Sequence, residues 1–325
     1  MDPNTAMEAA TEGAKALTKF QEIVQKVFGP RWTRKQADAD AYADERKLKT
    51  IRDNPDMEIV YIAGEMHARE RMPEMLALRA EQRMLTEWIR QEENIENVLE
   101  IAAQELQHDA DVSDEAVDED WIARLFNIVK DINNKGMQYV WGKILAGEIK
   151  QPGSFSLRTL DTIRNLSQKE AEIFQKTLPL VMEGDGDWFV TTKSSIHDRY
   201  GVTYEDIMIL DECGLIISNG SVSLTITISK DSIIAHNTRY ALLTEGLKGE
   251  KSFSFGIYSL TSAGKELLKI LEYNPNDAYF NDFAEFVFKE NMHSKLKIQP
   301  IQSIRDNKVR TTGETVREFC ISQKR

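Results

Sequence analysis

The stretch DWIARLFNIVKDINNKGMQYVWGKILAGEIKQPGSFSLRTLDTIRNLSQKEAEIFQKTL, residues 120–178, is the most regular part of the chain. Its apolar residues recur at intervals of three and four, which is the spacing of amphipathic helices. Asn133-Asn134 separates two of these helices by so few residues that we expect a helical hairpin. The one hard turn is Gln151-Pro152-Gly153-Ser154, and Ser167–Glu170 is a capping box that opens a later helix. The stretch therefore predicts a compact helical core.

Upstream of this core, residues 1–90 are typical of an extended helical arm. One helix is expected from Glu74 to about Leu106; its first half has scattered apolar residues without a clean heptad, and its second half has one clean stripe. Residues 33–52 are rich in Ala and charge and cannot bury a wide apolar face. Residues 57–61 are ambiguous between strand and helix. Helices that bury so little are exposed or pair with copies of themselves, so we expect a coiled-coil-like homo-oligomer.

A short amphipathic helix lies near the beginning of the arm. Its apolar stripe consists of Leu17, Phe20, Val24, Val27 and Phe28. Such a helix can dock on the body of the protein, or it can contact a membrane surface or a partner. Three lysines are few for a membrane anchor, so docking is the favoured interpretation.

Beyond residue 182 the sequence changes to short strands and turns. Strands are predicted at 188–190, 215–217, 222–228, 239–243, 254–260 and 295–304, and helices at 207–213 and 278–290. The order of helices and strands resembles a winged helix. We therefore expect a mainly α protein with a smaller α+β part. Its predicted parts are a helical arm (1–90), a helical core (91–182), a winged-helix-like α+β domain (183–275) and a C-terminal helix-strand unit with a tail (276–325).

The net charge of −12 comes from one segment. Between Glu92 and Asp120 there are 12 acidic residues and no Lys or Arg, and the other 41 acids equal the 41 bases of the chain. Within this segment, His108, Asp109 and Asp111 suggest a metal site, but the spacing does not fit a calcium loop. Carboxylates gathered at a helix N-terminus are the favoured interpretation, and metal binding by residues 108–120 stays open.

No motif of known catalytic chemistry is present. The chain lacks the phosphate-binding, dinucleotide, zinc-protease, serine-hydrolase and paired-cysteine signatures. Cys213 and Cys320 are far apart, which indicates a reduced compartment. We expect no cofactor, no metal and no catalysis, although dispersed catalytic residues leave the last point open. The N-terminus has no signal-peptide features and no run is long enough to span a membrane, so we expect a cytoplasmic protein, with peripheral contact at the inner membrane as an alternative.

Three runs, WGKILAGEI, PGSFSLRTL and LS-x-x-EA, carry a resemblance to a bacterial family known only as domain of unknown function 2806. The resemblance covers about residues 90–290 and implies no catalytic residues. More loosely, the segment ALTKFQEIVQKVFGPRWTRKQADADAYA is similar to the starts of proteins grouped with abortive-infection or phage-defence functions.

The candidate interaction surface in this stretch consists of Trp141, Glu148, Pro152, Gly153, Ser154 and Arg158. A structural interpretation is favoured, in which Trp141 is core, Pro152-Gly153 shapes a turn and Arg158 pairs with Glu148.

Two functions are compatible with the sequence. The first is a non-catalytic bacterial interaction or scaffold protein, self-assembling through its N-terminal helices and acting with a protein partner in phage defence. The second is a winged-helix nucleic-acid-binding or regulatory protein. Its candidate recognition helix, YEDIMILDEC, has four acids and no base and would repel phosphate, so nucleic acid is the disfavoured partner.

Overall fold

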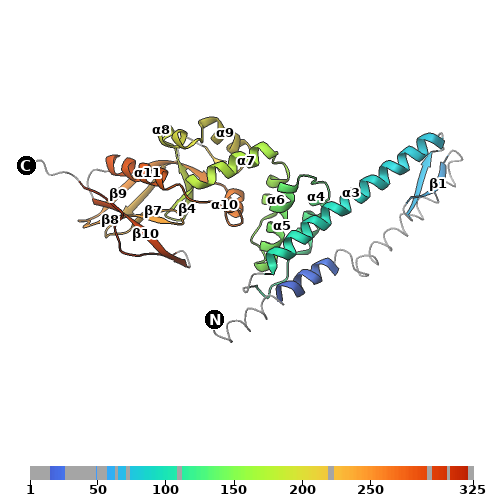
Figure 1. Ribbon diagram of the computed structural model, residues 1–325, viewed down its shortest axis with the longest axis horizontal. Coiled ribbons are helices and arrows are strands. Elements are labelled where there is room, and N and C mark those ends of the chain that lie inside the picture. Colours follow the sequence, from blue (N-terminus) through green and yellow to red (C-terminus); the bar gives the residue numbers. More distant parts are fainter. Residues whose placement is uncertain are drawn as a thin grey trace, which may run out of the picture. The chain divides into compact units, whose positions relative to one another are not determined.

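The structure is a computed structural model of the 325-residue chain (Figure 1). It describes residues 15–25, 49, 57–62, 65–70, 74–107, 112–218, 223–290, 295–305 and 308–320. The chain divides into two compact units, Met1–Leu157 and Arg158–Arg325. The four parts predicted from the sequence are a finer division, and their boundaries stay predictions.

The first unit is built on the long helix α3 (Glu74–Leu106), which is followed by α4 (Glu119–Val129) and α5 (Lys135–Lys150). A further helix covers residues 15–25. Strands β1 (Met57–Ile62) and β2 (Glu65–Glu70) form an antiparallel hairpin. Residues 57–61, which the sequence left open, are therefore strand, and the predicted helical arm contains this β-hairpin.

A side-chain cap begins each helix of the helical hairpin. The Asp118 side chain accepts a hydrogen bond from the Trp121 amide at 2.8 Å and begins α4. Asn134 accepts from the Met137 amide at 3.0 Å and begins α5. Each cap satisfies a backbone N–H that the first helical turn leaves without a partner. The short connection predicted at Asn133-Asn134 is confirmed.

The hairpin packs on the second half of α3 (Figure 1). The closest approach is at Gly142 of α5, where a Cβ atom would lie 2.4 Å from Ile101 Cγ2 and 3.2 Å from the Val98 carbonyl oxygen. At the end of the hairpin, the buried Asn94 amide donates to the Lys130 carbonyl at 2.8 Å, and Gln138 donates to Asn94 Oδ1 at 2.9 Å. These contacts fix where α3 meets α5.

The second unit opens with helices. These are α6 (Leu157–Arg164), α7 (Gln168–Thr177) and the 3-10 turn η1 (Leu178–Leu180), then, between strands, α8 (Ser194–His197), η2 (Asp198–Tyr200), α9 (Tyr204–Glu212), α10 (Ser262–Leu268) and α11 (Asp277–Glu290). The capping box Ser167–Glu170 is confirmed at α7, and Thr203 forms a second one with Asp206 at α9. Gly214 follows α9 with φ of 72°, the left-handed conformation in which glycine commonly ends a helix.

Ten strands of this unit form one antiparallel sheet. They are β3 (Met182–Gly184), β4 (Asp187–Thr191), β5 (Ile216–Ile217), β6 (Ser223–Ile228), β7 (Ile233–His236), β8 (Tyr240–Glu245), β9 (Lys251–Leu260), β10 (Lys295–Arg305), β11 (Lys308–Thr311) and β12 (Arg317–Phe319). The strand order is β11-β10-β8-β7-β3-β4-β9-β5, with β12 paired to β10 and β6 paired to β9.

This sheet overturns the expected fold class. A mainly α protein with a small α+β part is wrong, because a ten-stranded sheet dominates the C-terminal half. The strands expected to form a small winged-helix-like domain continue through β7 and β8 into β10, so the C-terminal strand belongs to the same sheet. The physical reason is that β7, β11 and β12 are only three or four residues long and gain their stability from long-range pairing, which local patterns do not report.

Helix α11 covers this sheet through an aromatic core. Phe283 lies 5.2 Å from Phe255 and 6.0 Å from Phe189 between ring centroids. The buried Tyr279 hydroxyl accepts a hydrogen bond from the Thr191 amide at 3.1 Å. The second half of the chain is therefore organised by helix-on-sheet packing.

The α3–α5 contact gives the first testable prediction. We expect Gly142→Ala to destabilise the protein, because overpacking costs typically about 1–3 kcal/mol, which exceeds the roughly 1 kcal/mol that Ala gains over Gly inside a helix. Urea unfolding of the first unit's helical signal measures the change. The control is Gly136→Ala in the same helix, where the new Cβ would meet only the Asn134 side chain, at 3.2 Å. A Gly142→Ala protein as stable as this control would contradict the close contact.

Candidate self-association surface

The residues proposed from the sequence as an interaction surface separate into three places. Trp141 is fully buried on α5. Glu148 is also buried, and its carboxylate accepts hydrogen bonds from the Gly153 amide at 2.6 Å and the Phe155 amide at 2.9 Å. Arg158 is an exposed residue of the second unit.

The Glu148 carboxylate thus holds the turn that contains Pro152, Gly153 and Ser154. Gly153 has φ of 83°, which favours glycine, and no atom lies within 4 Å of the position where its Cβ would be. The predicted turn is confirmed as a turn. Its use as an interaction surface stays a prediction, and so does the ion pair between Glu148 and Arg158.

The helix at residues 15–25 docks on the loop before α4. The Lys19 ammonium donates to the Ser113 carbonyl and, at 2.6 Å, to the Glu115 carbonyl, and Lys15 lies 3.5 Å from Asp114. Leu17, Phe20 and Val24 are half-buried, while Val27 and Phe28 lie outside the described residues. Two lysines of this helix therefore face an acidic loop.

The structure also bears on the metal site and the membrane contact that the sequence suggested. His108, Asp109 and Asp111 lie outside the described residues. Within the described ranges, no group of three or more His, Cys, Asp or Glu side chains is placed to hold a metal ion. Among the helices that the structure describes, none is both long and apolar enough to cross a membrane.

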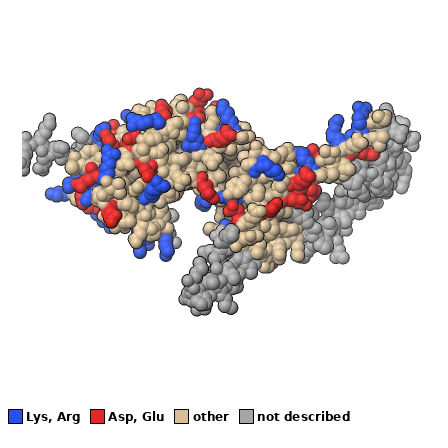
Figure 2. Space-filling view, in the orientation of Figure 1, with Lys and Arg blue, Asp and Glu red and all other residues tan. Residues whose placement is uncertain are grey.

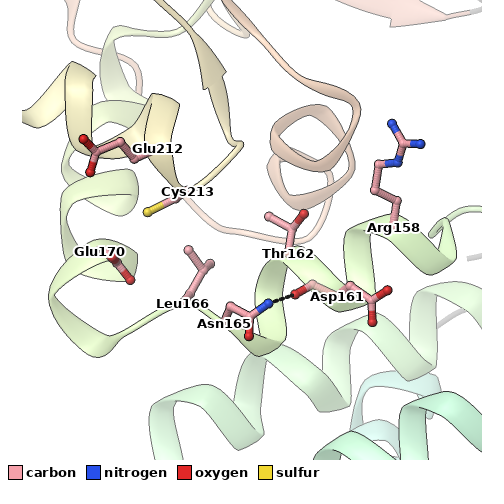
Figure 3. Close-up of a pocket in the computed structure, with 8 residues that line it drawn as sticks. All are labelled: Arg158, Asp161, Thr162, Asn165, Leu166, Glu170, Glu212 and Cys213. Atoms are coloured by element: carbon pink, nitrogen blue, oxygen red, sulfur yellow. Dashed lines mark hydrogen bonds between the residues drawn. The ribbon is translucent and has the colours of Figure 1, made fainter.

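One open pocket lies between α6, α7 and the end of α9 (Figure 3). Its volume is about 380 Å³, and it is lined by Arg158, Asp161, Thr162, Asn165, Leu166, Glu170, Glu212 and Cys213. Burial, and then the neighbouring Glu170 and Glu212 carboxylates, raise the pKa of the Cys213 thiol to about 12. Glu170 accepts a hydrogen bond from the Ser167 amide at 2.6 Å, and this bond lowers the pKa of its carboxyl.

One carboxylate of this pocket, that of Glu170, therefore belongs to the capping box of α7. A thiol with so high a pKa is protonated near neutral pH, and the thiolate is the nucleophilic form. The Arg158 guanidinium points away from Cys213 and Glu170 in Figure 3. The Cys213 thiol of this pocket is therefore not an activated nucleophile.

The surface that the sequence missed lies on the first half of α3. Five exposed residues follow a 3-4-3-4 spacing: Met75, Leu78, Gln82, Leu85 and Ile89. Of these, Met75 is 68% exposed, Leu78 47%, Leu85 49% and Ile89 53%. A 3-4 spacing places side chains along one side of a helix, at the a and d positions of a heptad. We call these five residues the α3 stripe.

The α3 stripe begins beyond the region where α3 packs on the hairpin. Arg90 of α3 contacts the turn between α4 and α5, where its guanidinium donates to Asn133 at 2.6 Å. From there toward Leu106, the apolar side of α3 is buried. Figure 1 shows α3 continuing past α4 and α5. In the sequence the stripe cannot be recognised, because other apolar residues lie between its members: Leu76, Ala77, Ala80 and Met84. The exposure of the side chains in the structure distinguishes the stripe.

Fold and surface together define an α+β protein whose helical unit presents an exposed stripe with heptad spacing on α3. Residues 78–284 match the family model described as a protein of unknown function, DUF2806. The match covers more than half of the chain, so the protein belongs to this family, as the resemblance predicted. No curated protein and no solved structure matches the chain.

The pocket yields a prediction about thiol reactivity. With its pKa raised to about 12, Cys213 should react slowly with a maleimide near neutral pH, whereas the exposed Cys320 should react quickly. The rate for Cys213 should rise as the pH approaches that pKa. Mass spectrometry of the native chain and of a Cys320→Ser variant measures both rates. Equal rates at the two cysteines near pH 7 would contradict the effect of burial and of the neighbouring carboxylates described for Cys213.

Proposed function

We propose that the protein is a non-catalytic scaffold protein that self-associates, one α3 stripe packing against the α3 stripe of a second copy. The observation that carries the proposal is the exposed heptad spacing from Met75 to Ile89. At 1.5 Å per residue the stripe is roughly 21 Å long, enough for two heptads of helix-on-helix packing.

The composition of the stripe favours a second copy as the occupant. Gln82 is at an a position between two apolar layers, where polar residues fix register and oligomer state at some cost in stability. A copy of the same helix offers a matching amide and matching apolar residues on both sides. An unrelated apolar partner would leave the Gln82 amide unpaired.

The energetics predict a concentration-dependent complex. Fully burying a Leu, Ile or Met side chain contributes about 1.5–3 kcal/mol, and these four are about half exposed, so two copies gain about 6–12 kcal/mol. Association costs about 4–15 kcal/mol in lost freedom. The α3 stripe alone therefore supports a weak to moderate dimer, which further arm contacts would strengthen.

The second candidate function, nucleic-acid binding through α9, gains no support from the charge of that helix. Glu205, Asp206, Asp211 and Glu212 lie on α9, which contains no Lys or Arg. Asp206 is 2.7 Å from Lys176, and Asp211 accepts from the Ser218 hydroxyl at 2.6 Å. The role in phage defence rests on the resemblance of the first helices and stays a prediction.

Two substitutions in one helix test the proposal. Leu78→Glu places a carboxylate in the seam, so the dimer dissociation constant should rise more than about tenfold, which is 1.4 kcal/mol. The matched control is Leu76→Glu, because Leu76 is 48% exposed and points away from the stripe. Sedimentation velocity of the full chain over a concentration series measures both. A parent protein that stays monomeric throughout, or an equal effect of the control, would overturn the proposal.

A further inference from the structure

The β10–β11 hairpin has a distinctly basic face. In this antiparallel pair Arg305 is opposite Lys308, and Ser303 is opposite Arg310. Residues directly opposite each other on paired strands project to the same face. One face therefore presents three cations and a hydroxyl, whereas Ile304 and Val309 pair on the other face. We call Ser303, Arg305, Lys308 and Arg310, together with the adjacent Gln302, the basic ribbon.

The cations of the basic ribbon differ from their neighbours in being unpaired. Nearby bases have carboxylate partners: Lys289 with Glu285 at 2.7 Å, Arg317 with Glu285 at 3.1 Å, Lys295 with Glu318 at 3.2 Å, and Lys297 with Glu245. Arg305, Lys308 and Arg310 are exposed, and none of them forms an ion pair with a residue that the structure describes. Among the described residues, these three cations on one face of the hairpin thus have no carboxylate partner.

The shape of this face also indicates a ligand surface. The five residues of the basic ribbon line a depression of about 590 Å³, and none of them is acidic. Figure 2 shows Lys and Arg side chains projecting at the end of β10. Strand β11 is the last in the strand order, so this side of the ribbon has no further strand beyond it.

We propose that the basic ribbon binds the phosphate backbone of duplex nucleic acid. Arg pairs bidentately with phosphate, Lys adds a point charge, and Ser and Gln are common donors to phosphate and sugar. A two-stranded ribbon also fits the major groove of a duplex. The prediction against nucleic acid concerned α9, and the ribbon is a different element with the opposite charge.

Two properties of the binding follow from these contacts. Phosphate contacts carry no sequence information, so affinity should be similar for duplexes of different sequence. The net charge of −12 opposes association with a polyanion, so binding should be strongest at low salt. Each phosphate neutralised adds about 0.9 to the slope of log K against log salt.

Charged residues on an edge strand also prevent pairing with other sheets. Glutamates would prevent such edge-to-edge pairing equally well, because negative charges on an edge strand also disfavour pairing with another sheet. Charge reversal of the ribbon therefore separates the two roles: it should abolish nucleic-acid binding and leave the fold of the chain intact.

The experiment compares the full chain with Arg305→Glu/Lys308→Glu/Arg310→Glu by fluorescence anisotropy, using a labelled duplex of about 20 base pairs at salt concentrations from about 50 to 200 mM. The control, Lys169→Glu/Lys230→Glu/Lys248→Glu, makes the same charge change at exposed lysines of other elements. We expect the parent and the control to bind, and the ribbon variant to lose at least tenfold in affinity and about 3 from the salt slope. A glutamine triple variant at the ribbon repeats the test, and circular dichroism checks folding.

Three results would overturn the proposal. The first is a parent chain that binds no duplex at the lowest salt. The second is a control variant that loses as much affinity as the ribbon variant, which would make the effect one of net charge. The third is competition by polyglutamate as strong as that by unlabelled duplex of equal charge, which would indicate an acidic protein as the partner.

Discussion

The close contact of α5 with α3 at Gly142 is the constraint on which the helical unit depends. Because residue 142 has no side chain, Ile101 of α3 can lie against the backbone of α5. That contact, together with Asn94 and Gln138, ties the second half of α3 into the core. Since α3 is one continuous helix, its first half is carried past the hairpin, and the α3 stripe is left exposed. The proposed assembly surface is thus a consequence of internal packing.

In the second unit, apolar packing stabilises the fold, and the charged residues of one hairpin remain on the surface. An aromatic core under α11, built around Phe189, Phe255 and Phe283, stabilises the sheet. Ion pairs neutralise most bases near β10, and the basic ribbon is the exception among the described residues of that region. A protein that assembles through α3 would present several ribbons at once, and linked sites bind a polyanion more tightly than a single site does.

The sequence predicted the features that interactions between neighbouring residues determine, namely helix caps and amphipathic helices. Side-chain caps at Asn134 and Ser167, and the apolar periodicity of α4 and α5, depend on residues a few positions apart. The ten-stranded sheet was missed because pairs such as β8 with β10 join segments about fifty residues apart in sequence. The α3 stripe was missed for a different reason: Leu76 and Leu78 are chemically identical, and only packing shows which one continues a heptad.

The most direct test of the central claim is amide hydrogen exchange of the full chain at about 1 and about 100 µM, since assembly responds to concentration by mass action. Amides of residues 74–89 open by local fraying in a free helix and should be protected once α3 stripes pair. We predict slower exchange in that segment at the higher concentration, with no change in residues 94–106, which are already packed on α5. Unchanged exchange over residues 74–89, with the chain oligomeric by mass, would contradict the account.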